Sequence, residues 1–124
     1  MTAFRYPLNR YIALPGEDDL WRLEEDLQLL DVSVGSGFEH DYASVPKIVR
    51  SVVDRCGRGG PAAIAHDFLY RECGHLGRKY CDQFFRDGLA VLGVNWAERQ
   101  AAYWGVRAGG WVAWNKHRKA EKNA

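Results

Sequence analysis

Cysteine and proline are scarce in this sequence of 124 residues, which holds three cysteines and four prolines. Cys56, Cys73 and Cys81 are odd in number and lack the close paired spacing of a disulfide framework, so we expect a reduced, intracellular protein. A bridge between Cys73 and Cys81 stays open as an alternative. No run approaches the roughly 18 apolar residues of a membrane span, and the N-terminus lacks the basic-then-apolar order of a signal peptide. The sequence therefore predicts a chain with no transmembrane segment and no signal peptide.

An excess of charge of either sign is also missing, because the formal net charge is only +1. Domains that hold phosphate backbones usually carry a marked surplus of lysine and arginine, so we expect no nucleic-acid partner. The exception is a small basic tail around Lys116, Arg118, Lys119 and Lys122. Such a tail is more typical of a solvated helix end than of a phosphate-binding arm.

Apolar and aromatic residues are plentiful, at 47% hydrophobic with five Trp, six Tyr and five Phe. At this length the chain has material for one core and no room for a second, so we expect a single domain over residues 1–124.

The first half of the chain is predicted to form strands. Between residues 21 and 29, apolar residues alternate with polar ones, interrupted on that face only by Glu25. A helix over the same segment is the competing interpretation, because Leu20, Leu23, Leu27 and Leu30 also fit a 3.6-residue period. Short segments at 10–14 and 32–38 are bounded by Pro15-Gly16 and by glycines, which is typical of hairpins. We favour the strands.

The second half is predicted to be helical. We expect a short helix over 45–55 with Pro46 in its first turn, and a second opened by Pro61 and ended by Gly74. A third helix over about 79–92 follows, and Asn95 with Glu98 three residues later is typical of a helix start. The last helix carries most of the tryptophans, weakened at Gly109-Gly110, and we expect those tryptophans in the core. The fold class is therefore α+β, with a small antiparallel sheet packed on three to four helices.

The polar residues of most interest lie in the second and third helices. His66 and Asp67 interrupt an apolar run, AAIAHDFLY at residues 62–70, and a buried charge there needs a hydrogen-bonded network or a metal. If the two helices fold back as an antiparallel hairpin, Asp82 can bond one imidazole nitrogen of His66. His66 would then deprotonate water with Asp82 as its orienting carboxylate, while Asp67 points elsewhere and could hold a hard cation. Tyr70 is placed to lie over either His66 or Asp67.

The alternative is a structural role, in which His66 and Asp67 are a buried pair with all their hydrogen bonds made inside the core and only hold two helices together.

His66-Asp67-x-x-Tyr70 followed by Asp82-x-x-Phe85 resembles the corresponding elements of the phospholipase A2 fold. The resemblance implies that His66 activates water, Asp67 binds calcium, Asp82 orients His66, and Tyr70 supports the aspartate by hydrogen bonding. It also implies a lipid ester as substrate.

A second resemblance covers residues 21–114. GFEHDYASVP at 37–46, AIAHDFLY at 63–70, Asp82 and Gly93-Val94 are similar, in order, to the phage- and prophage-associated domain-of-unknown-function family 1353. It implies a phage or prophage origin, hence the host cytoplasm or the virion as location and phage particle proteins as partners. It brings Asp41 and Ser44 forward as further site residues, although both could simply form the turn before Pro46.

Three functions remain in view. The lead is a metal-assisted, phospholipase A2-like hydrolase of a lipid ester, with calcium as the expected cation. The second is a metal-dependent hydrolase of cell-wall material that uses Asp41, His66, Asp67 and Asp82 as ligands. The third is a non-enzymatic phage structural or accessory protein. An open, polar pocket around these side chains would favour an enzyme, and a sealed, hydrogen-bonded cluster would favour a structural role.

Overall fold

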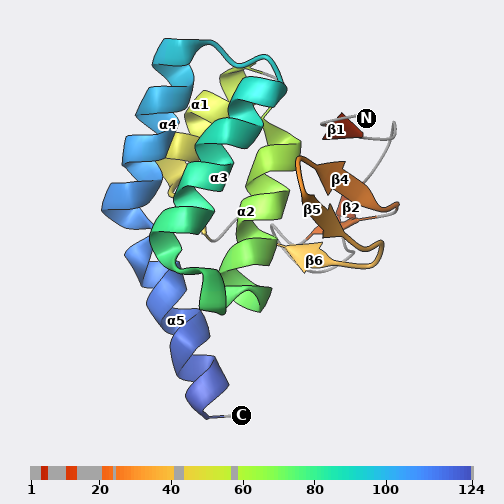
Figure 1. Cartoon of the computed structure of the whole chain (residues 1–124), viewed down its shortest axis with the longest axis vertical. Helices are drawn as coiled ribbons and strands as arrows, with labels where there is room; N and C mark the ends of the chain where they lie inside the picture. Colours follow the sequence, from red (N-terminus) through yellow and green to blue (C-terminus); the bar gives the residue numbers. More distant parts are fainter. Residues whose placement is uncertain are drawn as a thin grey trace.

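The computed structural model describes residues 4–5, 11–13, 21–23, 25–40, 44–56 and 59–123. Short strands precede a bundle of helices along the chain, and Figure 1 shows the strands gathered on one side of the bundle. The expected α+β class is confirmed. No helix in these ranges is long and apolar enough to cross a membrane.

The described strands form two small antiparallel sheets rather than the one expected. The first sheet has the order β1 (Phe4–Arg5), β4 (Leu27–Leu29), β5 (Val32–Val34), and the second has the order β2 (Tyr11–Ala13), β3 (Trp21–Leu23), β6 (Glu39–His40). β4 and β5 form a hairpin in which Leu27 pairs with Val34 and Leu29 with Val32. The prediction of hairpins in this half is confirmed, and the number of sheets is corrected.

A continuous strand over residues 21–29 is wrong, because the chain bends at Glu25 and the two halves join different sheets. Leu23, Leu27 and Leu29 are buried as the alternation predicts, whereas Glu25 and Asp26 are exposed. Glu25 occupies the position at which the alternation would bury a carboxylate. Burying an unpaired charge is costly, so the strand ends and the side chain turns to solvent.

The first helices follow the sequence closely. α1 (Lys47–Cys56) begins directly after Pro46, and α2 (Gly60–Glu72) has Pro61 in its first turn. Proline lacks a backbone N–H, but an N–H in the first turn of a helix has no intrahelical acceptor, so no hydrogen bond is lost there. A 3-10 turn, η1 (Gly74–Leu76), leads through Gly77 to α3 (Arg78–Val91). Gly77 has φ 87°, a conformation that a residue with a Cβ rarely adopts.

The expected last helix is two helices, α4 (Trp96–Gly109) and α5 (Trp111–Lys122), which meet at Gly110. The Asn95 side chain accepts the Glu98 N–H at 2.9 Å, so the predicted helix start is confirmed. With this division the described part of the chain holds five α-helices, against the three to four expected.

α2 is the central element of the fold. It contacts α1, α3 and α5 as well as β4, β5 and β6, and Figure 1 shows it between the other helices and the strands. Because both sides are covered, every residue from Pro61 to Asp67 is buried. Any polar side chain on α2 must therefore find its hydrogen-bond partners inside the protein.

Candidate functional site

His66 and Asp82 face each other across the α2–α3 pair. His66 Nε2 lies 2.7 Å from Asp82 Oδ1, and both side chains are fully buried. The hairpin of two helices, with η1 and Gly77 between them, brings together residues that are 16 positions apart in the sequence. The proximity predicted from the sequence is confirmed.

Asp82 is held by more than His66. The Tyr70 hydroxyl donates to Asp82 Oδ1 at 2.6 Å, and Arg107 Nη1 donates to Oδ2 at 2.8 Å. Arg78 Nη1 approaches the same Oδ2 at 3.4 Å while its guanidinium also donates to the carbonyls of Val106 and Arg107 near the end of α4. The carboxylate is thus fixed from three helices.

Sequence reasoning missed both arginines. Arg78 precedes Asp82 by four residues, a spacing at which helical side chains pair, so its signal was present. Arg107 lies 25 residues further on, and no local pattern marks it. Only the packing of α4 against α3 places it beside Asp82.

Ser44 lies on the other side of the imidazole. Its Oγ is 2.9 Å from His66 Nδ1, and its backbone N–H donates to Asp67 Oδ1 at 3.1 Å. The Ser44 hydroxyl also contacts Asp67 Oδ1, so its single proton can be given either to the imidazole or to the carboxylate. Ser44 immediately precedes the Val45-Pro46 lead into α1, which places it against the middle of α2.

The electrostatics favour a neutral His66. Burial lowers the pKa of His66, with a smaller lowering effect from Arg78, and the nearby Asp82 opposes this only in part. Burial tends to raise the pKa of Asp82, but hydrogen bonds from His66, Tyr70 and Arg107 outweigh it and the pKa is lowered. We assign the proton of the neutral His66 imidazole from its hydrogen-bond partners: Nε2 carries it and donates to the ionised Asp82 carboxylate. Nδ1 is then an acceptor for the Ser44 hydroxyl.

Tyr70 is a donor in this network. Burial and the neighbouring Asp82 raise its pKa, so the hydroxyl keeps its proton. The Tyr70 ring stands edge-on to the Trp114 ring of α5, with 5.2 Å between the ring centroids. Arg118 Nη2 donates to the Tyr70 carbonyl at 2.6 Å. Tyr70 was expected to support an aspartate by hydrogen bonding, and the aspartate to which it donates is Asp82.

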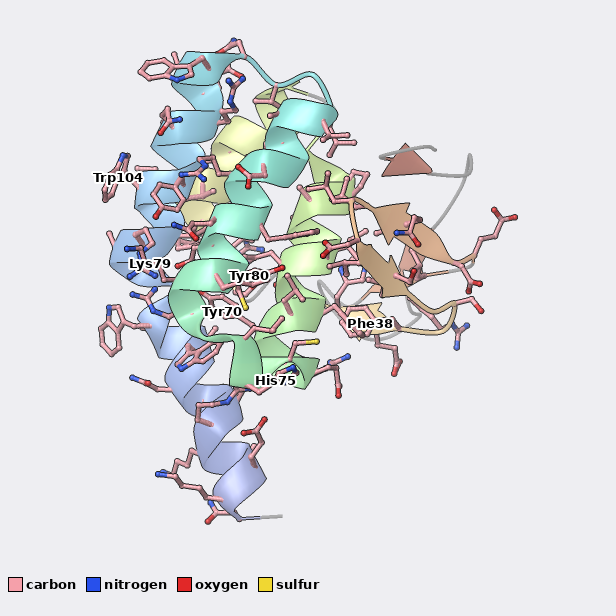
Figure 2. The ribbon with its side chains drawn as sticks, viewed as in Figure 1. Phe38, Tyr70, His75, Lys79, Tyr80 and Trp104 are labelled. Atoms are coloured by element: carbon pink, nitrogen blue, oxygen red, sulfur yellow. The ribbon has the colours of Figure 1, made fainter. Side chains whose placement is uncertain are left out.

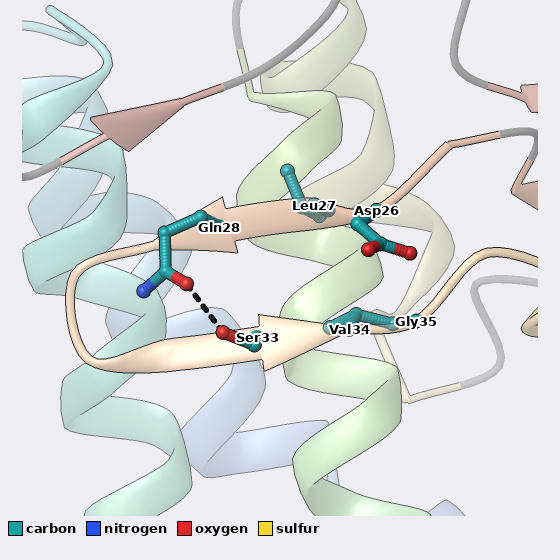
Figure 3. Close-up of a pocket in the computed structure, with 6 residues that line it drawn as sticks. All are labelled: Asp26, Leu27, Gln28, Ser33, Val34 and Gly35. Atoms are coloured by element: carbon teal, nitrogen blue, oxygen red, sulfur yellow. Dashed lines mark hydrogen bonds between the residues drawn. The ribbon is translucent and has the colours of Figure 1, made fainter.

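The cluster is closed to solvent. The exposed fraction is 0% for His66 and Asp82, 1% for Ser44 and 7% for Asp67. A hollow of about 240 Å³ lies instead on the β4–β5 hairpin, lined by residues that include Asp26, Gln28 and Ser33 (Figure 3). None of the cluster residues lines it.

A metal centre is not assembled by the residues that the structure describes. Among them no three His, Cys, Asp or Glu side chains gather as a ligand set. Asp82 meets the Nε2 side of His66 under two guanidinium groups, whereas Asp67 meets Ser44 on the Nδ1 side. Asp41, the other expected ligand, lies outside the described residues.

Other sequence expectations are settled by packing. Cys73 and Cys81 are free thiols, and burial raises the pKa of Cys81 to about 12, which makes it unreactive.

Trp114 packs on Tyr70, but Trp104 and Trp111 are 64% and 54% exposed, so a core role for these two is wrong. α4 packs against α3 and α5 packs against α2, and these two indoles lie on exposed sides of their helices.

Comparison with known proteins gives a family without an assigned activity. Residues 20–106 match the family described as a protein of unknown function, DUF1353. No curated protein and no solved structure matches the chain significantly. The matched region includes Ser44, His66, Asp67, Tyr70 and Asp82. Of the two arginines that hold Asp82, Arg78 lies inside it and Arg107 directly follows its end. The chain belongs to the DUF1353 family.

Proposed function

We propose that the protein is an acyl-ester hydrolase in which Ser44, His66 and Asp82 act in sequence. One observation carries the proposal: hydrogen-bonding contacts run from Ser44 Oγ to His66 Nδ1 and from His66 Nε2 to Asp82 Oδ1, at 2.9 and 2.7 Å. Hydroxyl, imidazole and carboxylate in this order perform acyl transfer on several unrelated folds. In the common arrangement the hydroxyl contacts Nε2 of the histidine and the carboxylate contacts Nδ1. Here Ser44 contacts Nδ1 and Asp82 contacts Nε2, but the proton still passes from the hydroxyl to the imidazole.

In the proposed first step, Ser44 Oγ attacks the carbonyl carbon of an ester while its proton passes to His66 Nδ1. Asp82 stabilises the resulting imidazolium, and Tyr70 and Arg107 keep the carboxylate in place. Collapse of the tetrahedral intermediate releases the alcohol, which takes the proton from His66. Water then hydrolyses the acyl-serine with the same base, and Ser44 is regenerated.

The lowered pKa of His66 supports this assignment, because a base that is already protonated at neutral pH cannot accept the serine proton. The phospholipase A2 resemblance supports a lipid ester as the first substrate to test, and the family resemblance supports a phage or prophage setting. In the phospholipase scheme a water molecule would stand where Ser44 Oγ stands here, with calcium on Asp67. No step of our proposal passes through calcium, because the described residues do not provide its ligand set.

The test is turnover of short-chain aryl esters and phospholipid vesicles, with calcium or with chelator, by the wild type and by Ser44→Ala, His66→Gln and Asp82→Asn. We expect each variant to lose on the order of 10²–10⁴-fold in rate. A fluorophosphonate probe should label Ser44 in the wild type. Ser51→Ala is the matched control, since Ser51 is exposed and its hydroxyl donates to the Lys47 carbonyl of the same helix at 3.3 Å.

The outcomes separate the nucleophiles. If Ser44→Ala keeps its activity, remains dependent on His66 and requires calcium, water is the nucleophile and the phospholipase scheme is right. Release of peptidoglycan fragments with a divalent cation, without ester turnover, would favour the cell-wall alternative.

A non-enzymatic role is the second candidate, and the closed state of the cluster favours it. A polar network with 0–7% exposure gives a substrate no access unless the surrounding chain moves. If the network serves only the fold, no ester is turned over, the probe labels nothing, and His66→Gln and Asp82→Asn unfold at lower denaturant concentrations. Such a result would leave a structural or accessory protein.

A further inference from the structure

α5 holds the last turn of α2 through one side chain, Arg118. The carbonyl groups in the last turn of a helix have no intrahelical N–H partner and need donors from elsewhere. Arg118 Nη2 donates to the carbonyls of Tyr70 and Arg71 at 2.6 and 3.4 Å. The same nitrogen lies 3.1 Å from a carboxylate oxygen of Glu121, one turn further along α5. The end of α2 is therefore fastened to α5 at the residue that donates to Asp82.

The Tyr70 ring is held by α5 as well. It meets the edge of the Trp114 indole, and the Arg118 guanidinium covers the same indole, with its central carbon 4.3 Å from the ring centroid. A cation over the face of an indole is attracted to the ring. In Figure 2 the Tyr70 side chain lies between α2 and α5. Arg118 thus acts on the backbone of Tyr70 directly and on its ring through Trp114.

The chain leaves a place for this guanidinium at Gly74. Gly74 begins η1, directly after the residue that ends α2, and a Cβ at this position would overlap the Arg118 guanidinium. The Arg118 side chain is only 20% exposed, so most of it is packed against the end of α2. The planar guanidinium can cover an indole with its face while its edge donates to carbonyl groups, which the ammonium group of lysine cannot do.

The position of the Tyr70 hydroxyl affects His66, because both side chains bind one oxygen. Tyr70 donates to Asp82 Oδ1, and the same Oδ1 lies 2.7 Å from His66 Nε2. If the hydroxyl withdraws, the charge of that oxygen acts on the imidazole alone and stabilises its protonated form. The Tyr70 hydroxyl therefore helps to keep His66 neutral, in the same direction as burial.

We propose that Arg118 is a positioning residue for the His66–Asp82 pair and acts on it through Tyr70. The proposal rests on the geometry of the network, and only the effect on a reaction rate rests on the proposed hydrolase function. The other polar and charged groups around the pair are unchanged in every variant below: Ser44 before α1, Asp67 on α2, Arg78 on α3 and Arg107 on α4.

The first experiment follows the ring nitrogens of His66 by NMR as the pH is lowered, with His66→Gln to identify the signals. Arg118→Met removes the hydrogen bonds to α2 and the cation over the indole, so His66 should take up its proton at a higher pH than in the wild type. Arg118→Lys should shift it less, because lysine keeps the charge and a donor. Lys119→Met is the matched control, since it removes the same charge from an exposed neighbouring position of α5.

Tyr70→Phe separates positioning from a general loss of stability. This variant lacks the hydroxyl, so it should raise the pKa of His66 by itself, and Arg118→Met should add nothing in the Tyr70→Phe background. The proposal is overturned if Arg118→Met titrates as the wild type does, or if His66 stays neutral in both over the whole pH range in which they are folded. An equal shift in Lys119→Met, or an undiminished effect of Arg118→Met in the Tyr70→Phe background, also overturns it.

Gly74→Ala tests the same link if Arg118→Met fails to fold. It keeps the charge of Arg118 but fills the space that the guanidinium occupies, so the hydrogen bond to the Tyr70 carbonyl should be lost. The pKa of His66 should then rise, as in Arg118→Met. Gly35→Ala, at a position with no atom within 4 Å of the added Cβ, should leave it unchanged. An unchanged pKa of His66 in Gly74→Ala contradicts the proposal.

The ester assay measures the part that rests on the proposed function. Arg118→Met should lower kcat about tenfold with KM unchanged, because the base is misaligned while the residues that would meet the substrate are intact. A wild type without esterase activity refutes the hydrolase and leaves the titration of His66 to decide the positioning. An active wild type whose kcat is unchanged in Arg118→Met overturns the proposed role of Arg118 and leaves the hydrolase standing.

Discussion

Gly110→Ala should destabilise the protein, although a glycine-to-alanine change in helical backbone is normally favourable. A Cβ at residue 110 would lie 2.4 Å from the Tyr70 hydroxyl oxygen and 2.6 Å from the Val106 carbonyl oxygen. Real Cβ atoms do not approach other heavy atoms so closely. The Val106 carbonyl belongs to the helix backbone and cannot move cheaply, so the Tyr70 ring or the α4–α5 junction has to shift.

The magnitude follows from what is displaced. Replacing glycine by alanine in a helix gains about 0.5–1 kcal/mol where space allows. Against this, forcing a methyl group into a filled site costs about 1–3 kcal/mol. Moving the Tyr70 hydroxyl by about 1 Å also breaks its 2.6 Å bond to Asp82, and a hydrogen bond to a charged group is worth about 1.5–3 kcal/mol. We expect a net loss of roughly 2–5 kcal/mol in the free energy of unfolding.

Urea denaturation followed by circular dichroism measures this loss, and a double-mutant cycle with Tyr70→Phe locates its cause. The phenylalanine removes the oxygen that the new methyl group meets, so Gly110→Ala should cost at least about 1 kcal/mol less in that background. Gly35→Ala is the control, because no atom lies within 4 Å of its Cβ position, and it should change stability by less than about 0.5 kcal/mol. If Gly110→Ala leaves stability unchanged, or costs the same in both backgrounds, the close contact between Tyr70 and Gly110 is not as described.

Three further predictions concern the buried network. Asp82→Asn should cost about 3–5 kcal/mol in urea denaturation, because it removes the charge that two guanidinium groups face; a cost under 1 kcal/mol would contradict the buried ion pairs. Arg107→Met should cost less, about 1–3 kcal/mol by the same assay, since Tyr70 and His66 still bind the carboxylate, and a cost as large as that of Asp82→Asn would refute that order. Stability should fall as pH is lowered from 7 to 5: the pKa of His66 is lowered in the folded state, so the unfolded chain takes up the proton first, with a slope of up to about 1.4 kcal/mol per pH unit. His66→Gln should flatten that slope in denaturation curves measured at several pH values, and a stability that rises on acidification would show that the sign is wrong.

The core of the site could be predicted from the sequence because its members lie on two neighbouring helices. Proline at the start of α2 and glycine after it mark out a hairpin, and the spacing within each helix then leaves few ways to place His66 and Asp82. Ser44 was found only as a family feature, and nothing local indicated that its hydroxyl would reach Nδ1. Arg107 and the Gly110 contact with Tyr70 have no local signal, because each depends on where α4 and α5 cross α2 and α3.

The sequence by itself determined the helical character of the second half, the Asn95 cap of α4, the burial of the leucines in β3 and β4, and the presence of polar groups inside α2. These follow from local backbone preferences and from the period of apolar residues, which act over a few positions. Only the tertiary structure decided that Glu25 splits one strand between two sheets, that two arginines neutralise Asp82, and that Trp104 and Trp111 face outward. Periodicity shows which residues share a face, but whether that face is covered depends on elements distant in the sequence, and their packing is a property of the whole chain.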